Sequence, residues 1–263
     1  MKRLLTLALL LLLTTPALAI DVPAYRASWT ATGADPTVAI SSPQTGDAIL
    51  LFVVSSNHNG TGDHPTASDD QSGTYSGTTC TTIWKQGSKW APFEVLVRDQ
   101  VASSTTAIAV DVDTQGKDAV VIAVAISGLT LWDSASPLQG CGSLFGGGSV
   151  RMVKATQYCA NCGGDNPIES GTTPLCPKAG TQTTAFVSTS LTLAVLANED
   201  SSPGVTAPSG WTQRATASST SQGKTVALNV TSRDSGFSGS TVTWGSTTPT
   251  DGATMLVEIQ PLQ

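Results

Sequence analysis

The feature that most constrains this chain is an ordered set of short apolar runs that occurs twice. The first set covers 47–56, 93–99, 106–112 and 118–128, and the second covers 190–198, 224–234, 240–245 and 253–261. These runs are rich in β-branched residues and are bounded by Gly, Ser, Pro and Asp, a pattern typical of strands. Beyond the first 20 residues, no stretch repeats apolar residues at helical spacing. The sequence therefore predicts an all-β fold.

The two sets match in order, which indicates an internal duplication. Aligned pairs keep the residue type: Ile49 with Leu191, Trp84 with Trp211, Arg98 with Arg233, and Ile126 with Ile259. The offset varies between 127 (211 − 84) and 142 (191 − 49), as expected if strands were kept while loops changed length. Short runs at 37–41 and 184–188 precede the two sets and bring each half to about five strands.

A five-strand half with one apolar face is too small to form a well-buried domain by itself. We therefore predict an antiparallel two-sheet β-sandwich of jelly-roll type, built from the two halves as a single domain over 20–263. Half one covers about 20–130, a Cys-rich connection about 131–180, and half two about 181–263. Two tandem small sandwiches are the alternative.

The runs differ in how deeply they should be buried. The run 190–198 alternates apolar and other residues, which predicts a half-buried strand. The run 118–128 is uniformly apolar, which predicts burial on both faces or a central position in a sheet. Trp84 and Trp211 are expected to pack in the core or at a sheet edge.

The N-terminus predicts export. Residues 1–19 combine Lys2 and Arg3, an apolar run over 4–13 and the small-x-small ending Ala17-Leu18-Ala19. This is a secretory signal peptide cut after Ala19, and its apolar run is too short to anchor the chain in a bilayer. We expect a secreted protein, periplasmic or extracellular, with no membrane insertion after cleavage.

Charge excludes one class of partner. The chain has 13 Lys and Arg against 19 Asp and Glu, and loss of the leader leaves a net charge of −8 (11 − 19). Such an acidic chain without a basic stripe lacks the electrostatic attraction that drives binding to phosphate backbones. Nucleic acid is not an expected partner.

The strand pattern resembles a family. The segments TGDAILLFVV (45–54) and TAPSGWTQRA (206–215), followed by VALNVTSRD and ATMLVEIQP, are similar to a repeated pattern in poorly characterised exported bacterial and phage tail-associated proteins. In that pattern a G-D-x-L strand precedes P-x-G-W, an aliphatic strand and a closing strand. The first half departs from it, since Trp84 lies in TIWKQG. The resemblance implies an all-β accessory or surface module without established catalytic residues.

Four cysteines lie in the segment that joins the halves: Cys141, Cys159, Cys162 and Cys176. In an oxidising compartment such a cluster is expected to crosslink a long irregular connection. A four-cysteine zinc site is less favoured because the second C-x-x-C is missing. Cys80 makes the number of cysteines odd, and the pairing stays open.

Two polar loops follow runs that the duplication makes equivalent. The loop 57–73 contains His58, Asp63, His64, Asp69 and Asp70, and the loop 198–204 contains Glu199 and Asp200. Binding loops often gather at one rim of a sandwich. Oxygen-rich loops suit Ca²⁺, and a His–Asp cluster suits a transition metal or a glycan. The alternative is that each is an ordinary solvated loop that binds no ligand.

Two function classes remain. The first is a non-catalytic exported protein that is structural, adhesive or glycan-binding, or that self-associates. The second is a secreted polysaccharide-active hydrolase or lyase on a jelly-roll scaffold. Fold alone does not choose between them. No catalytic residues can be assigned, and two His and three Tyr offer little material for an acid/base site, so the sequence favours the non-enzyme.

Overall fold

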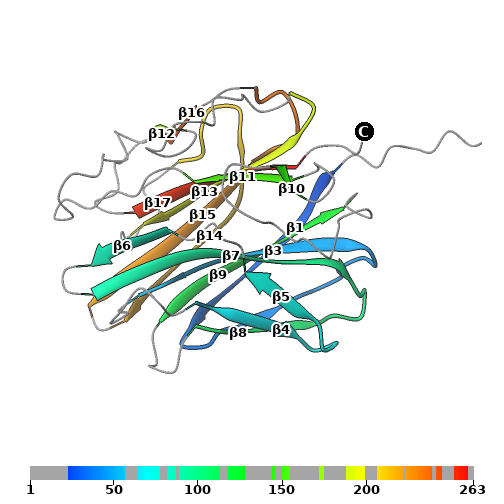
Figure 1. Cartoon of the computed structure of the whole chain (residues 1–263), viewed down its shortest axis with the longest axis vertical. Helices are drawn as coiled ribbons and strands as arrows, with labels where there is room; N and C mark the ends of the chain where they lie inside the picture. The colour runs from blue at the N-terminus through cyan, green and yellow to red at the C-terminus, as the bar shows by residue number, and fades with distance from the viewer. Residues whose placement is uncertain are drawn as a thin grey trace, which may run out of the picture.

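The structure is a computed structural model that describes 23–56, 64–77, 82–86, 89–112, 118–127, 144–145, 150–154, 172–174, 188–198, 206–221, 223–238, 241–244 and 252–259. Within these ranges the chain forms three antiparallel sheets and no helix, and hence no helix that could cross a membrane (Figure 1). The predicted all-β class is confirmed.

Sheet 1 has nine strands and uses only the first half of the chain. Its order is β1 (Ala24–Gly33), β9 (Ala119–Ser127), β3 (Asp47–Ser55), β7 (Lys89–Val101), β5 (Thr74–Gly77), β4 (Thr66–Asp69), β8 (Ala107–Asp111) and β2 (Thr37–Ala39), with β6 (Thr82–Gln86) also paired to β7. The prediction of about five strands for this half was wrong. The missed strands are poor in aliphatic residues, as in AYRASWTATG (β1) and TASD (β4).

Sheet 2 has six strands, in the order β10 (Leu144–Phe145), β11 (Val150–Lys154), β17 (Gly252–Ile259), β13 (Leu191–Asn198), β15 (Lys224–Arg233) and β14 (Thr212–Ser221). Sheet 3 is a pair of short strands, β12 (Thr172–Pro174) and β16 (Thr241–Thr243). Among the described residues, the second half (181–263) contributes β13 to β17.

One apolar cluster, the shared core, joins sheets 1 and 2. Leu50 and Phe52 of β3 contribute from one side, and Leu193 of β13 and Leu228 of β15 from the other. All four side chains are fully buried. Burial of such a side chain stabilises the fold by about 1.5–3 kcal/mol, so this cluster holds the two sheets together.

A second cluster, the inner core, lies on the opposite face of the same central strands. Leu51 of β3 and Val121 of β9 pack there with Val38 of β2, Ile108 of β8 and Ala67 of β4. Sheet 1 therefore curls so that β2, β8 and β4 cover the back of β3 and β9. Figure 1 shows β4 and β8 on one side of β3, β7 and β9, with β13 and β15 on the other. This explains why β9 is buried on both faces, as its uniform apolar run predicted.

The outer face of sheet 2 is also covered. Leu196 of β13 and Leu256 of β17 pack with Phe237 and Trp244, and Trp211 joins the edge of this outer cluster in a T-shaped contact with Phe237, their ring centroids 5.1 Å apart. Trp211 is thus a packing residue, as predicted. The prediction that 190–198 is half-buried was wrong, since β13 is buried along its whole length. The outer cluster removes its second face from solvent.

Ile49 of β3 and Leu191 of β13, which the sequence analysis aligned, face different clusters. Leu191 points into the shared core, whereas Ile49 points into the inner core. The neighbouring residue Ala48 is the one in the shared core. A shift of one residue turns a strand over, so Ile49 and Leu191 do not occupy equivalent faces.

We expect the two sheets to unfold together, because they bury one core between them. Leu50→Ala in sheet 1 and Leu193→Ala in sheet 2 should each cost about 2–5 kcal/mol of unfolding free energy and lower the Tm of the same single calorimetric transition. Thr37→Ala, at an exposed position of β2, should change stability by less than about 0.5 kcal/mol. Two transitions, each sensitive to only one of the leucine changes, would contradict this and favour tandem domains.

Candidate functional site

The candidate site is an open depression on the outer face of β4, β5 and β8. Its volume is about 450 Å³. Its lining includes five polar side chains, from Asp35, Thr66, Ser68, Thr74 and Asp111. All five are exposed.

Strand alternation places these groups on the outer face. In β8, Ile108 and Val110 are buried in the inner core, so Ala109 and Asp111 point outward. Thr66 of β4 lies opposite Asp111, and Ser68 lies between Ala109 of β8 and Thr74 of β5. The side chains in this cross-strand row are short, which keeps the floor of the depression shallow.

Asp35 lies in a turn outside the strands, and a backbone hydrogen bond fixes its side chain. It lies in the turn between β1 and β2 with φ +48°, in the left-handed region that Asp tolerates better than most residues. Its Oδ1 accepts a hydrogen bond from the backbone N–H of Val112 at 3.1 Å. Because Val112 directly follows Asp111, this contact holds the two carboxyl-bearing residues side by side.

The depression offers hydroxyl groups and carboxylates on an open surface. Small-molecule pockets are usually enclosed, whereas this depression is open. Its chemistry suits an extended ligand that is rich in hydroxyl or amino groups.

The loop residues predicted as ligand-binding are described only in part. His58, Asp63, Glu199 and Asp200 lie outside the described residues, and so do all five cysteines and the predicted disulfides. Within the described ranges, no three His, Cys, Asp or Glu side chains are grouped so as to hold a metal ion. The predicted Ca²⁺ site in these loops stays a prediction.

His64 pairs with a buried carboxylate. Its Nδ1 lies 2.6 Å from Oε1 of Glu94 on β7. Glu94 is 3% exposed whereas His64 is 59% exposed. The contact gives the buried Glu94 carboxylate a hydrogen-bond partner and fixes the orientation of the imidazole ring.

Asp69 has a structural role. Its Oδ1 accepts hydrogen bonds from the backbone N–H groups of Gln71 (3.0 Å) and Gly73 (2.9 Å), which closes the turn between β4 and β5. Its Oδ2 forms an ion pair with Arg98 of β7. The Arg98 guanidinium lies against Gly73, where a Cβ would collide with it, and 6.0 Å from the Tyr75 ring centroid.

Asp70 fixes a different loop. Its carboxylate accepts hydrogen bonds from the backbone N–H of Thr106, at 3.0 Å, and from the Thr106 hydroxyl. The hydroxyl contact is the main cause that holds the pKa of Asp70 below its ordinary value of 3.8. Burial, and the charge of Asp70, raise the pKa of Tyr75, which stays neutral.

The three predicted ligand residues that the structure describes, His64, Asp69 and Asp70, do not converge on one point. His64 is held by Glu94 and Asp69 by Arg98. Glu94 and Arg98 are four residues apart on β7, or about 13 Å.

The sequence interpretation selected His64, Asp69 and Asp70 by residue type, and it did not include Asp35 and Asp111. The alternation in AIAVD (107–111) could have placed Asp111 outside, whereas nothing local predicts the contact of Asp35 with Val112, 77 positions away.

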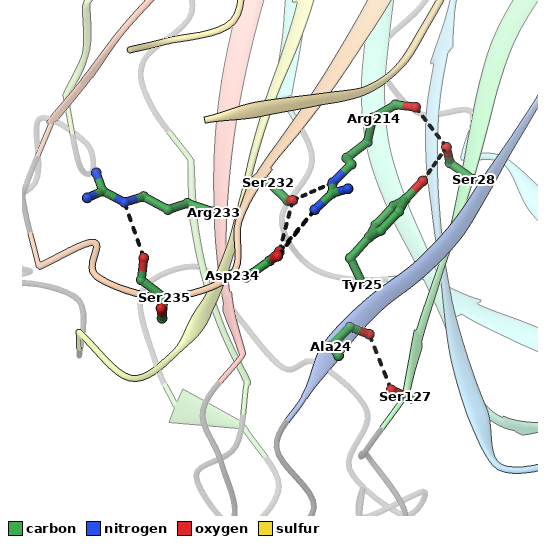
Figure 2. Close-up of polar contacts among 9 residues, drawn as sticks. All are labelled: Ala24, Tyr25, Ser28, Ser127, Arg214, Ser232, Arg233, Asp234 and Ser235. Carbon is green, nitrogen blue, oxygen red and sulfur yellow. Dashed lines mark hydrogen bonds and ion pairs between the residues drawn. The ribbon is translucent and has the colours of Figure 1, made fainter. Parts of the chain in front are cut away.

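A second polar cluster ties β1 to sheet 2 (Figure 2). Arg214 lies over the Tyr25 ring, with 4.1 Å between its Cζ and the ring centroid. Its Nε donates to Oγ of Ser232 at 2.6 Å, and its Nη2 donates to Oδ1 of Asp234 at 3.1 Å. The Ser28 hydroxyl donates to the Arg214 carbonyl oxygen at 3.0 Å. Because these groups contact one another, the cluster connects β1 with sheet 2.

Comparison with known proteins gives no relative: no family model, no curated protein and no solved structure matches this chain. The function of the chain can therefore be inferred only from the geometry of its surface.

Removing Asp69 should be costly, because it removes a buried carboxylate that pairs with Arg98 and accepts the hydrogen bonds closing the turn between β4 and β5. We expect Asp69→Ala to lower the unfolding free energy by about 3 kcal/mol in chemical denaturation. Asp234→Ala is the matched control, since Asp234 is 69% exposed and also pairs with an arginine; it should cost at most about 1 kcal/mol. Equal losses in the two variants would contradict the structural role of Asp69.

Thr106→Val should raise the pKa of Asp70 toward 3.8, because it removes the hydroxyl that most lowers it. The folded-state pKa lies below the unfolded value, so ionised Asp70 stabilises the fold at neutral pH. That contribution is lost as the pH falls from about 4 through the folded-state pKa. Titration of the Asp70 carboxyl carbon by NMR measures the shift. Thr212→Val, at an exposed position of β14 in sheet 2, should leave the titration unchanged; an unchanged Asp70 pKa in Thr106→Val would refute the assignment.

Proposed function

We propose that this chain is an exported, non-catalytic recognition protein that binds a glycan in the depression over β4, β5 and β8. The observation that carries the proposal is the convergence of three hydroxyl-bearing side chains and two carboxylates on one open surface of about 450 Å³. The leader at 1–19 supports export, and the resemblance to exported surface modules is consistent with adhesion.

A glycan fits this surface for chemical reasons. Its hydroxyl groups donate to and accept from Thr66, Ser68 and Thr74, and they donate to the carboxylates of Asp35 and Asp111. Hydrogen bonds to charged groups are worth about 1.5–3 kcal/mol, more than those between neutral groups. An extended sugar chain can also lie along a shallow surface that would leave a compact ligand largely exposed.

As its architecture we propose a two-sheet sandwich of jelly-roll type that arose by duplication. The order β9-β3-β7 in sheet 1 has a parallel in the order β17-β13-β15 in sheet 2. The registers also agree: Ala48 pairs with Ile126 as Leu191 pairs with Ile259. The corrected offset is 143 (191 − 48) for this strand. Under it, equivalent faces of the two halves meet in the shared core, which supports a single domain.

A secreted polysaccharide hydrolase is the second candidate. The specific observation in its favour is that Asp35 and Asp111 line the same depression, with Asp35 hydrogen-bonded to the residue after Asp111. Glycoside hydrolysis uses two carboxyl groups on either side of the scissile bond. In our primary proposal the same groups only bind.

Filling the depression should abolish recognition. Ala109→Trp places a large side chain on its floor, at an exposed strand position that can accept it. We expect binding to the glycans selected on an array to weaken at least about tenfold in calorimetry, equivalent to 1.4 kcal/mol. Ser104→Trp, in an exposed turn outside the depression, should bind as the unmodified protein does.

A reducing-sugar and lyase assay on the same glycans separates the two candidates. Binding without turnover supports recognition. Turnover that is lost in Asp35→Asn and Asp111→Asn would instead establish the hydrolase. Equal binding by Ala109→Trp and the unmodified protein would mean that the glycan does not bind in the depression.

A further inference from the structure

The depression over β4, β5 and β8 carries charge of one sign. Two of its lining residues are acidic, Asp35 and Asp111, and none of the described residues that line it is basic. The mature chain is itself acidic, with a net charge of −8 (11 − 19). Surface charge of one sign attracts ligands of opposite charge and repels ligands of like charge. The charge of a glycan should therefore decide how well it binds here.

Asp35 presents an ionised group to this surface. Among the described residues, its one hydrogen-bond partner is the backbone N–H of Val112, which donates to Oδ1 at 3.1 Å. An amide donor fixes a carboxylate without neutralising it. The Asp35 side chain is also exposed. A ligand cation that pairs with Asp35 therefore meets a carboxylate whose position is already set.

The other end of β8 is acidic as well. Asp70 donates its backbone N–H to the carbonyl oxygen of Ala107 at 3.2 Å, where β8 begins, whereas Asp111 ends the strand. These two ends are four residues apart, or about 13 Å. Asp70 is exposed, and its hydrogen bond with the Thr106 hydroxyl keeps its pKa below 3.8, so it is ionised at neutral pH. A ligand with positive charges along its length meets acidic residues at both ends of β8.

Hydroxyl groups lie between these acidic ends. Thr66 of β4 pairs with Asp111, Ser68 pairs with Ala109, and Thr74 of β5 lies opposite Ser68. An amino sugar offers both kinds of group that this row can bind, an ammonium for the carboxylates and ring hydroxyls for Thr and Ser. A basic peptide offers the cation without the ring hydroxyls, and it would leave the hydroxyl groups of the lining to water. The combination favours the sugar.

We propose that the ligand of the depression is an amine-bearing glycan, a chain of hexosamine units with free, protonated amino groups, and that Asp35 is a main partner of the ammonium. This inference rests on the proposed glycan-binding function and adds to it the sign of the ligand charge. Hydrogen bonds between an ammonium and a carboxylate are about twice as strong as those between neutral groups. Neutral glycans lack this contribution, and glycans with carboxylate or sulfate groups are repelled.

Calorimetry with three oligosaccharides of equal length tests the proposal. The probes are a glucosamine hexamer with free amines, the same hexamer fully N-acetylated, and a galacturonate hexamer. We expect the free-amine hexamer to bind at least about fivefold more tightly than the acetylated one, as one or two exposed ion pairs provide. The galacturonate hexamer should not bind. About 1 M salt should remove the preference, because it screens exposed charges beyond about 3 Å.

Asp35→Asn separates charge from shape. Asn also tolerates the φ of +48° at this position, and its side-chain oxygen can still accept from the Val112 amide. The affinity ratio between the free-amine and acetylated hexamers should fall at least about twofold. The ratio is the readout, because hydrogen bonds that both hexamers lose cancel in it. Asp234→Asn removes the same charge from an exposed position next to Arg214 in sheet 2 and should leave the ratio unchanged.

Four results would overturn the proposal. If the acetylated or the galacturonate hexamer binds as tightly as the free-amine hexamer, or if glycans from the array bind and no hexamer does, the charge selectivity fails and the glycan site stands. If no hexamer and no array glycan binds, both proposals fail. If pentalysine binds as tightly as the free-amine hexamer, the surface recognises charge without a sugar. If Asp35→Asn and Asp234→Asn lower the ratio equally, the preference reflects the net charge of the protein and not contact with Asp35.

Discussion

The fold depends on two strands that have no polar face. Leu50 and Phe52 of β3 point into the shared core, and Ile49 and Leu51 point into the inner core. β9 has the same character on both sides. Such strands are stable only when both faces are covered, and the chain meets this need in two ways. Sheet 1 curls back to cover one face with β2, β4 and β8, and sheet 2 covers the other. The positions of β2, β4, β8 and of the central strands of sheet 2 follow from this requirement.

Burial on this scale makes the few buried acidic side chains expensive unless hydrogen-bond donors meet them. Asp47, at the start of β3, accepts from Arg26 Nε at 3.2 Å and from the backbone N–H of Gln44 at 2.9 Å. Glu258 of β17 accepts from the Ser190 hydroxyl at 3.1 Å. Asp69 and Glu94 have Arg98 and His64 as their partners. Asp69 and Asp70, two of the acids that looked most like ligands in the sequence, likewise connect loops and strand ends to the layers.

The sequence predicted the strands whose residues are selected by hydrophobic burial. It missed the strands that form only because they pair with a neighbouring strand. The apolar runs of β3, β9, β13 and β17 were recognised because burial selects their residues. β1 and β4 were not, because Ala, Ser and Thr take strand conformation there only through their ladders with β9 and β8. The prediction for β13 failed for a related reason. Its alternation is real, but the outer cluster covers the face that the pattern left to solvent.

With these faces covered, the outer side of β4, β5 and β8 remains exposed. Its lining consists largely of Thr, Ser and Ala, in a chain of which only 12% is charged. Hydroxyl groups on a shallow surface give modest affinity, because water competes for each hydrogen bond. A repetitive glycan that binds several copies of the protein at once would offset this, because each further contact gains from a high effective concentration.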